Sequence, residues 1–525
     1  MITLTAAQVA AATGGHLAGI APTQAEQITC NFATTDSREV KPGPLFLAKP
    51  GAVTDGHLFV PAAVEAGAAF SLVEREISDA AGNLFPQIIV DDVVLAMGRL
   101  AKFCLSTMRE NGDLTVVGIT GSAGKTTTKD LLATMFERVG DTVAPVGSYN
   151  GEVGVPLTIF RANEETRYLV IEMGADHVGN IEYLANIVRP DHGVILKVGT
   201  AHAGEFGGVD NIEKTKGELA EGSTLTLALN DDDERVRRMI SRSLVPTTYF
   251  GVGEKNHDGG NHPRVYATEL ITGESGCPEF TLHFPQGDSF PVASKLIGEH
   301  HVYNLLAAAT VAFQAGVPVE IIAEQLNTSG AVSRWRMQRT DRADGITIIN
   351  DAYNANPESM VAALRSLAQL GRGANRRTWA VLGAMLELGD VSVEEHDRLG
   401  RLAVRMNISK LIAVGETAKP IYNAAHLEGS WGNEATWVSS PEEALDLLKM
   451  EALPGDIVLF KSSNGAGLGK LGETAANAPQ LIQNTSSPSS GSWLSAGDQA
   501  EALNSGIDEK TLSATHHTKD TREGK

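Results

Sequence analysis

The sequence predicts an α/β protein, and three observations support this fold class. At 525 residues, the chain is long enough for about three domains of ordinary size. Between residues 113 and 330, apolar strand-like runs alternate with helical stretches, which is the order that builds a mostly parallel sheet. A second alternation of the same kind follows. We therefore expect domains at 1–112, 113–330 and 331–480.

The N-terminal part, residues 1–112, mixes short strand-like pieces with turns such as "KPGPLF". A helix-like stretch around 94–108 then leads into "RENGDL", which we interpret as a polar link and the first domain boundary. At the other end, residues 481–525 are rich in Ser, Gly and charge and poor in apolar residues. That composition is typical of a disordered tail.

Composition excludes several classes of function. The formal charge is 43 − 64 = −21, which argues against sequence-independent binding of nucleic acid. The three cysteines lie far apart, with neither metal-ligand nor disulfide spacing, as in proteins of a reducing compartment. No basic leader and no membrane-length apolar stretch is present. We expect a cytoplasmic monomer, with no membrane insertion and no nucleic-acid partner.

The run "TVVGITGSAGKTTTKDL" (115–131) predicts a phosphate-binding loop. A strand over 115–120 and a helix over 126–139 enclose a Gly-rich turn, so that backbone N–H groups and a helix N-terminus face an anion. Lys125 can reach the outer phosphates and the Thr126 hydroxyl can bind Mg²⁺. Ile119 stands where the first glycine of the usual spacing is expected, so a turn that binds nothing stays an alternative. The expected phosphate contacts are Gly121, Ser122, Ala123, Gly124, Lys125, Thr126 and Thr127.

Later strands of the central domain are expected at 168–174, 192–199 and 224–230. Glu172 ends the first of them beside the phosphate loop, where a carboxylate is a natural Mg²⁺ ligand, although it could also face water. His202 follows the next strand. A histidine alone in such a place is more often structural, but its position beside Glu172 favours a function. By default, Lys216 is a solvated lysine on a helix.

The C-terminal domain is expected to contain strands at 346–351, 378–383, 410–415 and 456–462, with helices over 394–407 and 441–450 between them. Its least ordinary stretch is "INDAYNANPESM" (349–360), where polar residues crowd between a strand end and Pro357. One of them serves to cap the helix. Asp351 could in addition bind a ribose hydroxyl, and Tyr353 or Asn354 an adenine.

Taken in order, these motifs resemble the Mur ligase family, and within it the MurF type, over about residues 28–465. The motifs are "TGSAGKTT", "IEMGADH", "VGTAHAGEFG", "KGEL", "GEHHVYN", "WRMQR", "NDAYNANPESM" and "VLGAMLELGD". The N-terminal "TTDSREVKPGPLF" is similar to the uridine-nucleotide-binding domain of the MurE and MurF types. The resemblance implies an N-terminal UDP-binding α/β domain, a central P-loop ATPase domain and a C-terminal Rossmann-like domain.

The resemblance also implies roles for residues around ATP and Mg²⁺. Lys125 and Thr126 would hold the phosphates and Mg²⁺, while Glu172 and His202 would serve the metal ions. Lys216 matches a lysine that many members carboxylate to a carbamate at a second Mg²⁺. The positions that match contacts to adenine, γ-phosphate and ribose are Asn304, Arg336, Asp351, Tyr353 and Asn354. Of these implied residues, the catalytic ones would be Lys125, His202, Lys216 and Arg336.

For the second substrate, Ser37 and Arg38 match contacts to uridine diphosphate, and Asn150 lies in the loop that meets the muramoyl part. The chain also departs from the family pattern at a few positions around adenine and the dipeptide. These positions are Lys197, His301, Ala384 and Asn464.

The implied reaction is ATP-dependent joining of D-alanyl-D-alanine to the terminal carboxylate of UDP-N-acetylmuramoyl-tripeptide, through an acyl phosphate, in peptidoglycan synthesis. Alternatives within the superfamily are another Mur ligase or an amide ligase of the folylpolyglutamate-synthase type. Outside it, a P-loop kinase would phosphorylate a hydroxyl, and a nucleotide-gated regulatory protein would hydrolyse ATP without an acceptor.

Overall fold

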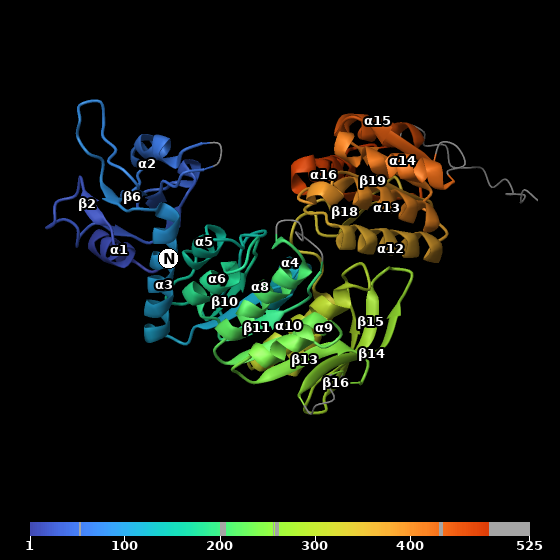
Figure 1. Ribbon diagram of the computed structural model, residues 1–525, viewed down its shortest axis with the longest axis horizontal. Coiled ribbons are helices and arrows are strands. Elements are labelled where there is room, and N and C mark those ends of the chain that lie inside the picture. The colour runs from blue at the N-terminus through green and yellow to red at the C-terminus, as the bar shows by residue number, and fades with distance from the viewer. Residues whose placement is uncertain (52–53, 200–205, 256, 258–261, 430–433, 482–525) are drawn as a thin grey trace, which may run out of the picture. The chain divides into compact units, whose positions relative to one another are not determined.

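The computed structural model describes residues 1–51, 54–199, 206–255, 257, 262–429 and 434–481 (Figure 1). The tail expected at 481–525 lies outside the described residues except for Leu481. Three larger sheets follow one another along the chain, as the α/β fold class predicts. No helix within the described ranges is both long and apolar enough to cross a membrane.

The N-terminal sheet has five strands in the order β2-β7-β6-β5-β4. All neighbours are parallel except β2 and β7. The strands are β2 (His16–Ala18), β4 (Ala33–Thr34), β5 (Leu45–Leu47), β6 (Phe70–Val73) and β7 (Gln87–Ile89), and the first helices are α1 (Ala6–Thr13) and α2 (Val60–Glu65). Strands β1 (Leu4–Thr5) and β3 (Thr29–Cys30) form a separate antiparallel pair. Leu45, Phe46 and Leu47 are fully buried, so both faces of this short sheet are covered.

Helix α3 (Val93–Asn111) is longer than the sequence indicates. Asp92 caps its N-terminus by accepting from the Leu95 N–H (2.8 Å). The expected polar link "RENGDL" was wrong for Arg109 to Asn111, because these residues form the last turn of the helix. The buried face of α3 shares one apolar cluster with residues of the N-terminal and of the central sheet. A domain boundary at residue 112 stays a prediction.

The central sheet has nine strands among the described residues, in the order β16-β15-β14-β13-β12-β11-β8-β10-β9. Seven strands from β9 to β14 are parallel, which confirms the mostly parallel sheet, and β15 and β16 extend it as an antiparallel edge. The parallel strands are β8 (Thr115–Thr120), β9 (Thr142–Val143), β10 (Tyr168–Glu172), β11 (His192–Ile195), β12 (Thr226–Asn230), β13 (Thr247–Val252) and β14 (Arg264–Thr272). The edge strands are β15 (Pro278–His283) and β16 (Ser289–Ala293).

Helices surround this sheet at the positions that βα alternation requires. They are α4 (Lys125–Phe136), α5 (Gly154–Ile159), α6 (Asn180–Val188), α8 (Val209–Gly222), α9 (Glu234–Arg238), α10 (His301–Gln314) and α11 (Val319–Thr328). Helix α4 begins one residue before the expected 126 and ends at Phe136, before the expected 139. The turn that follows tightens to i→i−3 bonds, from the Arg138 N–H to the Met135 carbonyl (3.3 Å) and from the Val139 N–H to the Phe136 carbonyl (2.9 Å).

The C-terminal sheet has the order β17-β18-β22-β19-β20-β21, with only β17 antiparallel among the described strands. The strands are β17 (Gln338–Asp341), β18 (Thr347–Asn350), β19 (Thr378–Leu382), β20 (Lys410–Val414), β21 (Ala435–Val438) and β22 (Ile457–Lys461). The helices are α12 (Pro357–Gly373), α13 (Ser392–Arg405), α14 (Lys419–Glu428), α15 (Pro441–Glu451) and α16 (Leu468–Asn477). The strands expected in this region are therefore all present.

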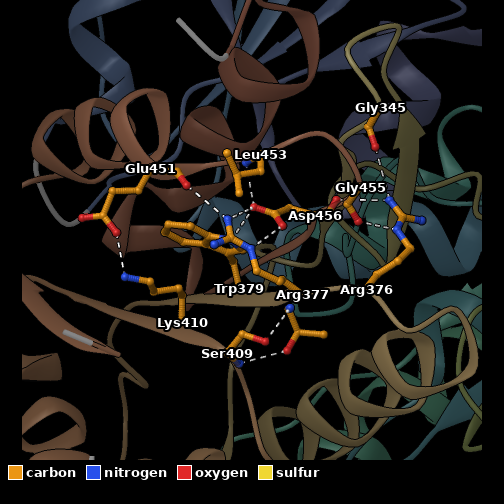
Figure 2. A network of polar contacts seen from close by, with 11 residues as sticks. Gly345, Arg376, Arg377, Trp379, Ser409, Lys410, Glu451, Leu453, Gly455 and Asp456 are labelled. Atoms are coloured by element: carbon orange, nitrogen blue, oxygen red, sulfur yellow. Dashed lines mark hydrogen bonds and ion pairs between the residues drawn. The ribbon is translucent and has the colours of Figure 1, made fainter. Parts of the chain in front are cut away.

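A buried carboxylate fixes the start of the central strand β22. Figure 2 shows Asp456 accepting from the Arg377 guanidinium (2.6 and 2.9 Å), the Trp379 indole N–H (2.8 Å) and the Leu453 N–H (2.9 Å). Asp456 is 2% exposed, so its charge depends on these donors. The same contact raises the pKa of Arg377. Asp456 thus joins β19, β22 and the end of α15.

We expect Asp456→Ala to lower the free energy of unfolding by about 3 kcal/mol, because it removes the acceptor of the Trp379 indole N–H and of the Leu453 N–H and the charge partner of the Arg377 guanidinium. Asp446→Ala is the matched control, since Asp446 forms only an exposed pair with Lys449 on α15 and should cost about 0.5 kcal/mol or less. Urea denaturation followed by circular dichroism measures both. Equal midpoints for the two variants would contradict this account of the network.

Candidate active site

A cavity of about 720 Å³ lies where the phosphate loop and the carboxyl ends of β10, β11 and β12 meet residues that follow β18. It is lined by residues 122–127 of the loop, by the start of α10, and by Arg336, Asp351, Tyr353 and Lys461 from the C-terminal part. Ligands of open α/β sheets bind at the carboxyl ends of the strands. Most of the residues that the sequence predicts for ATP lie here.

The phosphate loop has the backbone that close approach to an anion requires. Gly124 has φ +88°, and a Cβ there would lie 2.1 Å from the Asn304 Oδ1 atom. Glycine is therefore needed both for the left-handed conformation and for the contact with α10. The Lys125 ammonium donates to the Gly121 carbonyl (2.7 Å), and burial lowers its pKa.

Oxygen atoms gather directly beside the loop. The Thr126 hydroxyl donates to Glu172 Oε2 (3.0 Å) and lies 3.1 Å from the Ser148 hydroxyl. The other Glu172 oxygen accepts from the Asn150 amide (2.9 Å). Glu172 is 1% exposed, so it is not the water-facing acid that the sequence left open. Uncharged and anionic oxygens are the donors that Mg²⁺ prefers, so these residues fit that ion.

Arg336 reaches the same cluster from the C-terminal part. Its Nη2 atom donates to the hydroxyls of Thr126 (3.1 Å) and Ser148 (3.2 Å). The guanidinium also lies over the Tyr353 ring, 4.4 Å from the ring centroid, in a cation–π contact. Two positive groups, Lys125 and Arg336, thus line the same cavity beside the phosphate loop.

The structure overturns the default interpretation of Lys216. The residue lies in α8 and is only 5% exposed, so it is not a solvated lysine. Burial, assisted by the nearby Lys125 ammonium, lowers its pKa to about 7. A large share of its amine is therefore neutral and nucleophilic near pH 7. His202, its expected neighbour at the metal ions, lies outside the described residues.

Asp351 has an ion-pair partner that the sequence did not suggest. Its Oδ2 atom lies 2.5 Å from the Lys461 ammonium, and its Oδ1 atom accepts from the Met337 N–H (3.0 Å). Lys461 also donates to the Asn354 carbonyl (3.1 Å). Lys461 is 2% exposed at the end of β22. In the sequence, its burial is signalled only by its place directly after the four apolar residues of "IVLFK".

The wall formed by α10 carries neutral polar groups. Burial lowers the pKa of His300 to about 4 and that of His301 well below its ordinary value. The Asn304 amide lies 3.1 Å from His301 Nδ1, while His301 Nε2 is buried with no hydrogen-bond partner among the described residues. Both rings are neutral at pH 7 and can accept or donate one hydrogen bond to an uncharged ligand.

Not all predicted residues meet at this cavity. Asn150 lines it, whereas Gly121 and Lys216 do not. Ser37 and Arg38 are also absent from its lining. These two lie in a short 3-10 helix (Ser37–Glu39) of the N-terminal part, where the Arg38 side chain is 87% exposed and pairs with Asp36 (2.6 Å). Cavity residues that the sequence reasoning missed include Ser148, Asp232, His300, Glu358 and Lys461.

Three family models match the chain in order. They are described as the Mur ligase family catalytic domain, residues 29–103, the Mur ligase middle domain, residues 119–312, and the Mur ligase glutamate ligase domain, residues 335–464. Together they cover most of the described chain.

Among curated relatives, the UDP-N-acetylmuramoyl-tripeptide–D-alanyl-D-alanine ligase of Mycobacterium leprae is 42% identical over 508 residues, covering 90% of this chain and 98% of the relative. The ligase of the same name from Escherichia coli is 33% identical and covers 81% and 89%.

Solved structures agree with these relatives. MurF from Acinetobacter baumannii matches with a TM-score of 0.77 and 32% identity, covering 90% of this chain and 99% of that one. MurF from Thermotoga maritima, solved in complex with ADP, matches with a TM-score of 0.70 and 28% identity, covering 85% and 97%. The chain therefore belongs to the Mur ligase family and, within it, to the MurF type.

Proposed function

We propose that this protein joins D-alanyl-D-alanine to the terminal carboxylate of UDP-N-acetylmuramoyl-tripeptide at the expense of ATP. The observation that carries the proposal is the cluster of Thr126, Ser148 and Glu172 beside the phosphate loop, with Lys125 and Arg336 lining the same cavity. Relatives of that name align over nine-tenths of the chain, and a related MurF holds ADP.

The first step activates the carboxylate. One of its oxygens attacks the γ-phosphorus of ATP, the bond from that phosphorus to the bridging oxygen breaks, and ADP leaves with an acyl phosphate as the other product. The ammonium of Lys125 and the guanidinium of Arg336 neutralise charge on the transferred group. Thr126 and Glu172 would hold Mg²⁺, which supplies positive charge between a carboxylate and a triphosphate that repel each other.

The second step forms the amide. The free amine of D-alanyl-D-alanine attacks the acyl carbon, the carbon–oxygen bond to phosphate breaks, and the nitrogen loses a proton. Water would destroy the acyl phosphate, so the cavity must be closed to solvent at this stage. Arg336, Asp351 and Tyr353 approach the phosphate loop from the C-terminal part and suit that purpose.

The residues that would bind the other parts of ATP and of the uridine substrate can be assigned from the chemistry of their side chains. The neutral His301 and Asn304 suit an uncharged adenine, and Asp351, Tyr353 and Asn354 would lie near the ribose and its base. Ser37 and Arg38 would bind uridine diphosphate, and Asn150 the muramoyl part. We place the reaction in the cytoplasm, in the stage of peptidoglycan synthesis that uses nucleotide-linked precursors, and we propose that the protein works as a monomer.

One assay tests this function against its rivals. Purified protein is supplied with ATP, Mg²⁺, UDP-N-acetylmuramoyl-tripeptide and D-alanyl-D-alanine, and each substrate is omitted in turn. We expect phosphate release only with all substrates present, together with a product whose mass shows a new amide. A phosphorylated product would indicate a kinase, and phosphate release without an acceptor would indicate a regulatory ATPase.

The proposal assigns ATP and the uridine substrate to different parts of the chain, so two single changes should have opposite effects. We expect Lys125→Ala to reduce turnover by about a hundredfold or more while binding of the uridine substrate, measured by calorimetry, stays within a few-fold. Arg38→Ala should instead weaken that binding about tenfold and leave ADP binding intact. If either variant loses binding of both the uridine substrate and ADP, the assignment of the two ligands to different parts of the chain is wrong.

Lys216 should carry a carbamate, since its pKa of about 7 makes the amine available to CO₂. Protein labelled with ¹³C-bicarbonate should show a carbamate carbon resonance that is missing in Lys216→Ala. At constant dissolved CO₂ the signal should grow as pH rises through about 7, because the amine then loses its proton. Turnover of Lys216→Ala should fall by orders of magnitude and recover in part with formate or acetate, but not with chloride.

Lys214→Ala is the control on the same helix, because Lys214 is exposed and should change stability by about 0.5 kcal/mol or less. Full activity of Lys216→Ala without added carboxylate would eliminate the carbamate.

A further inference from the structure

We propose that Trp335 is a positioning residue that holds the Arg336 guanidinium at the phosphate loop, an inference whose catalytic meaning rests on the function proposed above. The two residues belong to the 333–337 segment, which connects the central part of the chain to β17. Four features of this segment carry the proposal: its contacts with both the central and the C-terminal part, its backbone conformation, the packing of the Trp335 ring and the placement of Arg336.

Residues of the 333–337 segment contact elements of both the central part and the C-terminal part. The Ser333 N–H donates to Asp130 of α4 (3.2 Å), and the Arg334 guanidinium donates to Glu473 of α16 (3.0 Å). Trp335 then faces α16, and Arg336 returns to the phosphate loop. The segment is therefore anchored within five residues to α4 of the central part and to α16 of the C-terminal part.

The backbone around Arg336 has a conformation that side chains disfavour. Trp335 has φ +59° and Met337 has φ +50°, both in the left-handed region. A Cβ atom makes that region unfavourable, and a bulky residue there needs compensation from its surroundings. Two such residues on either side of one arginine indicate that the orientation of that arginine matters.

The Trp335 ring supplies the compensation by packing against α16. A Cβ on Gly469 would lie 2.4 Å from the ring, so the indole rests directly on the helix backbone. The Trp335 carbonyl accepts from the Tyr353 N–H (3.3 Å), which fixes the peptide that leads into Arg336. The Trp335 indole N–H is buried with no hydrogen-bond partner among the described residues, so the ring acts through packing and through the Arg334 guanidinium that lies 5.4 Å from its centroid.

Arg336 consequently points out of the C-terminal part. Its guanidinium lies over the Tyr353 ring and donates to the hydroxyls of Thr126 and Ser148, which are distant from Arg336 in the sequence. Rotation of the Trp335 peptide would carry the guanidinium away from both hydroxyls. If Trp335 were only a core residue, its loss would affect stability and leave the effect of Arg336 unchanged.

A double-mutant cycle separates the two interpretations. It uses the full chain, as wild type, Trp335→Ala, Arg336→Ala and the double variant. We expect Trp335→Ala to lower kcat by about a hundredfold, as misplacement of a catalytic group does, with the KM for D-alanyl-D-alanine within a few-fold. In the Arg336→Ala background, Trp335→Ala should have almost no further effect, since it acts through the arginine.

Binding gives a readout that does not depend on ligation. With Mg²⁺ present, Trp335→Ala should weaken a non-hydrolysable ATP analogue about tenfold while ADP binds as in the wild type, because only the analogue has the terminal phosphate that Arg336 reaches. The affinity for the analogue is measured for all four members of the cycle. If the effects of the two substitutions on this affinity are non-additive in a protein that fails to ligate, the positioning role is upheld and the proposed function is rejected. Additive effects in an active ligase would overturn the positioning role alone.

Three further variants guard against simple misfolding. Gly469→Ala displaces the Trp335 ring while leaving the sequence of the 333–337 segment intact, and it should reproduce the fall in kcat. Trp335→Phe keeps an aromatic ring and should retain most of the wild-type kcat. Lys470→Ala, exposed and adjacent to Gly469 on α16, should behave as wild type. Wild-type rates in folded Gly469→Ala and Trp335→Ala would overturn the proposal.

Discussion

Burial of the Glu172 carboxylate is the constraint on which the rest of the site depends. A charge that has left water must be matched by donors or by cations. Here the Thr126 hydroxyl and the Asn150 amide donate to its two oxygens. The phosphate loop, the strand end of β10 and the loop that holds Asn150 are therefore held in one arrangement by a single side chain.

Charge is distributed unevenly around the cavity, as the proposed binding of ATP would require. Lys125 and Arg336 line the cavity near the loop, where the proposed triphosphate would bring negative charge. The Asp351–Lys461 pair neutralises itself and so remains a polar surface without net charge. On the α10 side, His300 and His301 are kept neutral by burial. A cationic wall there would attract the phosphates to the wrong end of the cavity.

The elements that the sequence could predict are those whose signal is local. The strand over 115–120 and the turn before Lys125 follow from periodicity and glycine placement, and they are found at the expected residues. The burial of Lys216 could not be read from "NIEKTKGEL", because it depends on what packs over α8. The Asp351–Lys461 pair likewise joins residues 110 positions apart, and the left-handed Trp335 depends on a glycine of α16. Resemblance to a family pointed to Lys216 and Arg336, but it gave no account of what holds them.

Helix α3 has a consequence for how the chain folds as it is made. Its buried face belongs to a cluster that includes Leu45 and Leu72 of the first sheet and also Ile159 and Ile187, which are synthesised much later. The first sheet therefore leaves the ribosome with one face of its last helix still uncovered. Until α5 and α6 follow, that face exposes apolar surface of the kind that chaperones bind, so the N-terminal part completes its core only together with the ATP-binding part.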